Sequence, residues 1–274
     1  MDFKIMSWNI NKFCGANNTF TTKDDNLKEI VKIIKDFFQN NENGVVILQE
    51  VCPKEKFEEI KKQLTAEKLI IKEPVKVTRE SEKQPYFEYS EDNETKKRLI
   101  TTEVIAVVTE SSKWEVPPNS LFDNYNNYKN RIVELICKNP ENENNNINIL
   151  GVHMNGDTKF WEKLNEHMNG KSNMIAVGDF NVNLKKTGQQ GYDHNDDFIK
   201  IKTSRFEDLV PEHKRTYKDT NDNAPIDHML VSTKMYEEKI YKYEKCSICD
   251  ENEDNENDYR LSDHKRIISP TFKF

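Results

Sequence analysis

The sequence predicts an α/β protein with mixed β-sheets and helices on the outside. Segments with helical and strand periodicity alternate in the early part of the chain, and strand-like runs dominate later. Only 35% of the residues are apolar, but 14 Phe, 10 Tyr and 3 Trp are typical of a packed fold. Neither an internal repeat nor a linker rich in Pro, Gly or Ser interrupts the 274 residues. We therefore expect a single domain that covers residues 1–274.

The first elements alternate between strands and helices. Residues 3–10 form the first predicted strand, and Asp24 or Asp25 then caps a helix whose apolar residues recur at helical spacing up to Phe38. The apolar run at 45–48 predicts a buried strand, and Pro53 begins a charged helix that extends to about residue 68. Three predicted strands follow, at 69–77, 103–109 and 131–137.

The second half of the chain is richer in strands. We expect strands at 148–152, 174–182, 226–232 and 266–274. A helix is predicted at 158–168, where Phe160, Trp161 and Leu164 share one face, and a second short helix is predicted around 204–210. A polar loop is expected at 183–197.

Several predicted strands run directly into polar residues. Asp179 and Asn181 follow the apolar run that begins at Ile175, and residues i and i+2 of a strand face the same side. If the strand continues through Asn181, both side chains point toward one polar site. The other polar residues at strand ends are Asn9, Gln49, Glu50, His153, Asn155, Asp227, Asp263 and His264.

These residue types suit metal-assisted hydrolysis of a phosphate ester. Carboxylates such as Glu50 and Asp263 are hard oxygen ligands for Mg²⁺ or Mn²⁺. A carboxylate such as Asp179 can position and deprotonate the attacking water, and histidines can donate to phosphoryl oxygens or to a leaving group.

Six segments in this order, SWNI, LQE, GVHMN, GDFN, IDHMLVS and LSDH, resemble the endonuclease/exonuclease/phosphatase superfamily, which includes deoxyribonuclease I and exonuclease III-like enzymes. The resemblance runs from residue 4 to residue 268. It implies a four-layer α/β sandwich, in which two mixed β-sheets pack face to face with helices outside. It also places the site at one rim between the sheets.

The resemblance implies a metal site and a set of substrate contacts. Glu50 would be the principal ligand of Mg²⁺, or of Mn²⁺, with Asn9 beside it at the metal or the phosphate and Asp263 next to the metal. Arg131 would contact phosphate, and Asn155 would contribute to substrate binding.

The same resemblance implies the catalytic roles. Asp179 would activate water and Asn181 would hold the phosphoryl group. His264, oriented by Asp227, would contact the phosphate and stabilise charge, and His153 would aid the leaving group.

The favoured function is a Mg²⁺-dependent DNA endonuclease. Basic residues between Lys185 and Lys218 could contact phosphates, whereas the acidic run at 250–258 would repel a polyanion. Two alternatives stay open: a phosphatase-like or phospholipase C-like hydrolase of a phospholipid head group or a small phosphodiester, and an inactive binding scaffold. Asn11 stands where abasic endonucleases usually carry Asp, so the subfamily is not assigned.

Net charge, cysteine content and the absence of targeting patterns indicate where the protein is expected to act. The net charge is -7, and removing the six acids of residues 250–258 leaves -7 + 6 = -1. The five cysteines form no metal-binding pattern beyond a lone C-x-x-C at Cys246 and Cys249. The sequence contains no signal-peptide pattern and no apolar run long enough for a membrane span, so we expect a cytoplasmic monomer with reduced thiols.

Overall fold

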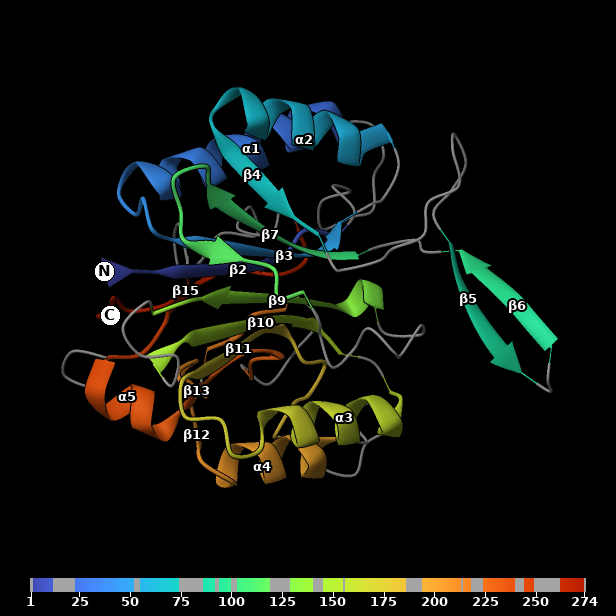
Figure 1. Ribbon diagram of the computed structural model, residues 1–274, viewed down its shortest axis with the longest axis vertical. Helices are drawn as coiled ribbons and strands as arrows, with labels where there is room; N and C mark the ends of the chain where they lie inside the picture. Colours follow the sequence, from blue (N-terminus) through green and yellow to red (C-terminus); the bar gives the residue numbers. More distant parts are fainter. Residues whose placement is uncertain are drawn as a thin grey trace.

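The computed structural model describes residues 2–11, 23–51, 55–73, 86–91, 94–99, 103–118, 129–139, 145–154, 156–185, 194–212, 214–217, 224–239, 244–248 and 262–273. Two six-stranded sheets form the centre of the molecule and lie face to face, with helices on both outer sides (Figure 1). This arrangement confirms the predicted four-layer α/β sandwich.

The first sheet contains the strands from the early part of the chain and two short strands near its end. Its central pair, β2 (Ile5–Asn9) and β3 (Val45–Val51), is parallel, and the other pairings are antiparallel. The remaining strands are β4 (Leu69–Lys72), β7 (Glu103–Thr109), β14 (Ser247–Ile248) and β15 (Ile267–Ile268), in the spatial order β14-β15-β2-β3-β7-β4.

The second sheet has the order β12-β13-β11-β10-β9-β8. Its central strands β10 (Ile147–His153) and β11 (Met174–Asp179) are parallel, and the other pairings are antiparallel. The remaining strands are β8 (Trp114–Glu115), β9 (Ile132–Cys137), which follows the 3-10 turn η4 (Lys129–Arg131), β12 (Phe206–Asp208) and β13 (Asp227–Ser232).

The strand sequences explain why both faces of each sheet are covered. Val45 and Ile47 of β3 face the core between the sheets, whereas Val46 and Leu48 face the core under the outer helices. Helices α1 (Lys23–Gln39) and α2 (Glu55–Ala66) cover the first sheet. Helices α3 (Thr158–Met168) and α4 (Asn195–Thr203) cover the second (Figure 1). Helix α5 (Thr233–Lys239) lies beside β12 and β13, and its Met235 packs into the core between the sheets.

The elements predicted around 204–210 and at 266–274 differ from those in the structure. The helix expected around 204–210 is β12, because Asp208 pairs with Leu230 of β13 and extends the sheet; the helix α4 precedes it. The strand expected at 266–274 is broken into β15 and β16 (Phe272–Lys273), with Ser269 and Pro270 between them. Proline has no N–H to continue a sheet ladder.

Two pairs of strands stand apart from the large sheets. Strand β1 (Asp2–Phe3) pairs with β16, which brings the two ends of the chain together. Strands β5 (Tyr86–Glu91) and β6 (Glu94–Leu99) form a hairpin that projects from the sandwich (Figure 1). Among the described helices, none is long and apolar enough to cross a membrane.

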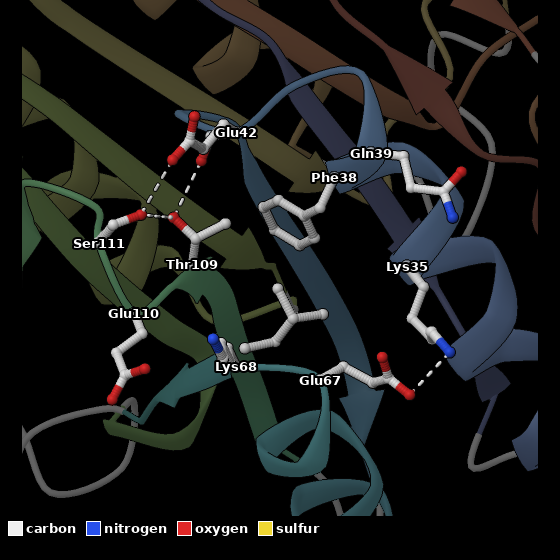
Figure 2. A pocket seen from close by; sticks show the side chains of 10 residues that line it. Lys35, Phe38, Gln39, Glu42, Glu67, Lys68, Thr109, Glu110 and Ser111 are labelled. Carbon is white, nitrogen blue, oxygen red and sulfur yellow. Dashed lines mark hydrogen bonds and ion pairs between the residues drawn. The ribbon is translucent and has the colours of Figure 1, made fainter.

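A pocket of about 580 Å³ lies between the end of α1 and the strands β4 and β7 (Figure 2). Phe38 forms part of its apolar wall, and an ion pair of 2.8 Å joins Lys35 to Glu67 at its edge. Thr109 Oγ1 donates to the Glu42 carbonyl across the pocket. Glu42 precedes β3, so the pocket lies at the opposite end of that strand from Glu50 and is not part of the candidate site.

Candidate active site

The polar residues predicted at strand ends meet at one rim of the sandwich. Asn9 and Glu50 come from the first sheet, and His153, Asp179 and Asp227 come from the second. In the second sheet His153 pairs with Asp179, which pairs in turn with Asp227. The central strands of both sheets therefore end at the same rim of the sandwich, and their terminal polar residues lie there.

Asn9 connects the two sheets. Its Nδ2 donates to Glu50 Oε1 at 3.2 Å and to Asp179 Oδ2 at 3.1 Å, and its Oδ1 accepts from the Asn11 N–H at 3.0 Å. The side chain is fully buried. An amide carries two donor hydrogens, so one residue can hold two carboxylates from different sheets in a fixed relation.

Glu50 reaches this position through an irregular backbone. The pairing of β3 with β7 shifts between Leu48 and Val51, and Glu50 adopts a φ of 54° in the left-handed region. A non-glycine residue in this region is strained, and bulges of this kind re-aim a side chain. The carboxylate stays partly exposed, and its Oε1 lies 3.8 Å from His153 Nε2.

Asn181 lies beyond the end of β11. The expectation of a strand through Asn181 was wrong, because β11 ends at Asp179 and Asn181 has a φ of 52°. The Asn181 N–H donates to Asp179 Oδ1 at 2.9 Å, and its Nδ2 donates to the Met154 carbonyl at 3.1 Å. The two residues are therefore close through a left-handed turn and not through strand alternation.

The residue before Asp179 must be glycine. Gly178 has a φ of 146°, and a Cβ at this position would lie 2.0 Å from the carbonyl oxygen of Val152. The close approach of β10 and β11 at the rim depends on this missing side chain.

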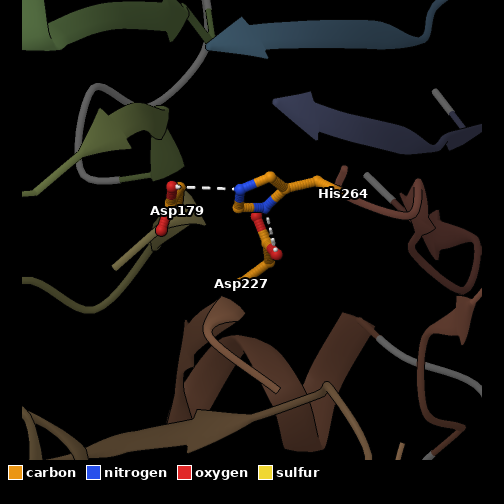
Figure 3. A group of neighbouring side chains, drawn as sticks. All are labelled: Asp179, Asp227 and His264. Atoms are coloured by element: carbon orange, nitrogen blue, oxygen red, sulfur yellow. Dashed lines mark hydrogen bonds and ion pairs between the residues drawn. The ribbon is translucent and has the colours of Figure 1, made fainter. Parts of the chain in front are cut away.

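Asp227 and His264 form a buried pair on the other side of Asp179 (Figure 3). His264 Nδ1 lies 2.9 Å from Asp227 Oδ2, and His264 Nε2 lies 3.8 Å from Asp179 Oδ2. Asp179 thus has the His264 ring on one side, and His153 Nε2 also lies 3.7 Å from its Oδ2.

Hydrogen bonds from neighbouring segments hold this pair. Thr216 Oγ1 accepts from the Ile226 N–H at 3.0 Å and the Asp227 N–H at 3.1 Å. Trp8 Nε1 donates to the His264 carbonyl at 3.0 Å. Ser262 Oγ donates to the Asn9 carbonyl and accepts from the His264 N–H at 3.1 Å. Trp8 and Ser262 lie within the SWNI and LSDH segments but were not predicted as site residues, and Thr216 was missed because a single Thr in a polar segment carries no signal of its own.

Burial and charge move the pKa values of the two central groups. Burial raises the pKa of Asp179 to about 7, although the charge of His264 opposes this rise. Burial alone would lower the pKa of His264, but the carboxylates of Asp227 and Asp179 outweigh it and raise that pKa to about 10. His264 is therefore an imidazolium at neutral pH and donates from Nδ1 to Asp227.

Two groups of residues can be compared as metal ligands. Asp179, Asp227 and His264 offer ligand atoms within 4.8 Å of one another, a spacing compatible with a metal ion. His264 Nδ1 already lies 2.9 Å from Asp227 Oδ2, so a metal ion held by this cluster would have to displace the proton between them. Glu50 offers a partly exposed carboxylate next to Asn9, and a carboxylate is a suitable ligand for a hard divalent cation.

The remaining predicted residues lie nearby or outside the described residues. Arg131 Nη1 donates to the His153 carbonyl at 3.3 Å, so its guanidinium is close to the rim. Asp263 is half-buried between Ser262 and His264. Asn155 and the acidic run at 250–258 lie outside the described residues.

The structure is similar over its whole length to solved endonuclease/exonuclease/phosphatase structures. One such protein, from Bacteroides vulgatus, has 14% identity and a TM-score of 0.59, with 100% of both chains covered. The endonuclease domain of TRAS1, a telomere-specific non-LTR retrotransposon, has 12% identity and a TM-score of 0.57, covering 100% of this chain and 99% of that one. The 3' phosphatase NExo (D146N) from Neisseria, bound to a product DNA hairpin, has 14% identity and a TM-score of 0.56, covering 99% and 100%.

This likeness identifies the fold as that of endonuclease/exonuclease/phosphatase structures, as the sequence motifs predicted. No protein-family model matches the sequence. No curated protein matches it either.

Proposed function

We propose that this protein is a metal-dependent phosphodiesterase that cleaves DNA as an endonuclease. The observation that carries the proposal is the placement of Asp179 between two sets of groups. On one side Asn9 holds it beside Glu50, and on the other side lies the His264 imidazolium with its Asp227 partner. Phosphodiester hydrolysis needs a base for the attacking water, oxygen ligands for a metal ion and a positive charge near the phosphoryl group. Asp179, Glu50 and His264 would supply them.

Glu50, with Asn9 and Asp263 nearby, would hold Mg²⁺ or Mn²⁺. A divalent ion there would neutralise part of the negative charge that develops on the phosphoryl group. The partly exposed Glu50 carboxylate and the half-buried Asp263 would supply oxygen atoms to this ion.

Side chains of the protein would accept the proton of the attacking water and stabilise the negative charge of the phosphoryl group. Asp179, once ionised, would orient a water and accept its proton, because it is buried and its pKa lies near neutrality. His264 would donate a hydrogen bond to a phosphoryl oxygen, and its pKa of about 10 keeps it charged. Asn181 would donate to the same group, and His153 would assist the leaving oxygen.

DNA is the proposed substrate because polynucleotide ligands occur among the similar structures. NExo was solved with a product DNA hairpin, and D. rerio TDP2 was solved with a single-stranded DNA product. The basic residues expected to bind phosphate give only partial support. Lys200 pairs with Asp197 at 3.2 Å and Lys202 with Glu212 at 3.0 Å, so part of that charge is neutralised.

Mg²⁺-dependent nicking of supercoiled plasmid, intact and partly depurinated, tests the proposal. We expect the wild type to nick the plasmid, and EDTA or His264→Ala to abolish nicking. Cutting confined to depurinated plasmid would assign abasic-site specificity. Absence of nicking in both plasmids would contradict a DNA endonuclease and direct the assay to phospholipid head groups and small phosphodiesters.

A further inference from the structure

The chain is held in place again shortly after the left-handed turn at Asn181. Asn183 is fully buried, although it lies beyond the end of β11. The side chain of Asn195 supplies the hydrogen bonds that a neighbouring strand would otherwise supply. Its Oδ1 accepts from the Asn183 N–H at 3.2 Å, and its Nδ2 donates to the Asn183 carbonyl at 2.7 Å. Buried backbone groups need such partners, and an amide offers an acceptor and a donor at once. We call these two hydrogen bonds the Asn183–Asn195 clamp.

Asn195 has a fixed position because the helix that it begins is packed. It is the first residue of α4, and it is only 3% exposed. Phe198 of the same helix packs against Phe180, the residue that precedes Asn181, with ring centroids 5.4 Å apart. The clamp therefore connects the segment after the turn to a packed helix on the outer face of the second sheet.

Asn181 adopts a backbone conformation that its surroundings must enforce. Its φ of 52° lies in the left-handed region, which is unfavourable for a residue with a Cβ. The chain is fixed before the turn by β11, which ends at Asp179, and after the turn by the clamp at Asn183. Asn181 itself is exposed, and its Nδ2 donates to the Met154 carbonyl. An amide nitrogen carries two hydrogens, so the direction of the second one is set by this contact and by the backbone.

We propose that Asn195 is a positioning residue of the candidate site, which holds Asn181 through the backbone of Asn183. The inference rests on the proposed function, in which the Asn181 amide donates to the phosphoryl group. Asn195 is buried and acts through the chain without contact to the substrate. A misplacement of about 1 Å can slow a reaction about a hundredfold, so loss of the clamp should be measurable in the rate of turnover.

Asn195→Ala removes both hydrogen bonds of the clamp, and Asn146→Ala is a matched control. Asn146 Oδ1 accepts from the Asn139 N–H at 2.8 Å, and Asn146 precedes β10 at the end of that strand opposite His153. Hydrolysis of bis(p-nitrophenyl) phosphate with Mg²⁺ would be measured for both variants. We expect Asn195→Ala to lower kcat about tenfold with KM within about twofold of wild type, and Asn146→Ala to match the wild type.

Combination with Asn181→Ala separates positioning from a general loss of stability. If Asn195 acts through Asn181, the double variant Asn181→Ala/Asn195→Ala should have the kcat of Asn181→Ala within about twofold. An additional loss of about tenfold in the double variant would overturn the proposal. Asn195→Asp serves if the alanine variant does not fold, because an acid suits the first turn of a helix. It lacks the Nδ2 donor, and we expect the same loss and the same non-additivity.

Hydrogen exchange of the Asn181 backbone amide tests the inference without turnover. This N–H donates to Asp179 Oδ1 at 2.9 Å, so a loosened turn should exchange faster. We expect exchange at least about tenfold faster in Asn195→Ala and unchanged in Asn146→Ala. Unchanged exchange in Asn195→Ala would overturn the proposal. If the wild type does not hydrolyse the phosphodiester, the proposed function fails, whereas the exchange measurement still decides whether Asn195 holds the turn.

Discussion

Asp227→Asn should destabilise the protein in a pH-dependent way. The substitution keeps the shape of the side chain but removes the charge that His264 Nδ1 meets at 2.9 Å. Both residues are buried, at 2% and 6% exposure. The effect of the substitution on stability therefore depends on whether His264 is protonated.

The magnitude follows from the raised pKa of His264. A rise from 6.5 to about 10 corresponds to about 5 kcal/mol of preference for the charged ring in the folded protein, to which Asp179 also contributes. This stabilisation is fully present below pH 6.5 and is lost as the pH rises through 10. A hydrogen bond to a charged group is worth about 1.5–3 kcal/mol, so Asp227→Asn should cost about 2–3 kcal/mol at pH 6. The cost should be much smaller near pH 10, because the ring of the unfolded chain is neutral there and the folded ring is only about half protonated.

Urea unfolding in EDTA at pH 6, 7.5 and 9.5 measures this dependence. His264→Gln supplies the control, since in that background Asp227→Asn should have a cost independent of pH. Equal destabilisation by Asp227→Asn at pH 6 and pH 9.5 in the wild-type background would refute the assignment of a charged His264 paired with Asp227.

Three further outcomes are expected. Asp179→Asn should abolish activity and raise the unfolding free energy at pH 8 in EDTA by about 1 kcal/mol or more. The pKa of Asp179 is raised in the folded protein, so its ionisation costs stability as the pH rises from 3.8 to 7. A less stable variant would count against this. Glu50→Gln should remove the increase in melting temperature that Mg²⁺ gives the wild type, and an unchanged increase would place the metal elsewhere. Gly178→Ala should lower the free energy of unfolding by about 3 kcal/mol or more, since the new Cβ would lie 2.0 Å from the carbonyl oxygen of Val152. Gly156→Ala is the control and should change thermal unfolding little, because nothing lies within 4 Å of its Cβ position.

The location of the candidate site could be predicted from the sequence because it depends on strand direction. Apolar runs that end in Asn9, Glu50 and Asp179 identify buried strands with polar ends, and parallel central strands bring those ends to one rim. The order of the six motifs then gave the layered fold that the structure confirms.

The local backbone of the site could not be predicted. Hydrophobic periodicity reports which face of an element is buried, but it does not report that Glu50 and Asn181 adopt left-handed conformations. Those conformations depend on a bulge in β3 and on hydrogen bonds to Asp179 and Met154. Such non-local contacts leave no pattern in the sequence.

Segments stabilised by distant partners were also missed. Thr216 supports Asp227 through hydrogen bonds to a segment ten residues away, and the strand β12 forms because Asp208 lies against β13. Asp208 also binds His228 Nδ1 at 2.7 Å, which holds that histidine in the interior and away from Asp227. Helix propensity around 204–210 was outweighed by this pairing.

Hydrolysis of bis(p-nitrophenyl) phosphate with and without Mg²⁺ tests the central claim most directly, because it needs no assumption about DNA. The account predicts turnover by the wild type that rises with Mg²⁺, is abolished by EDTA, and falls at least about a hundredfold in Asp179→Asn and in His264→Ala. Turnover without a divalent ion, or full activity in both variants, would contradict a metal-dependent phosphodiesterase built around Asp179 and His264.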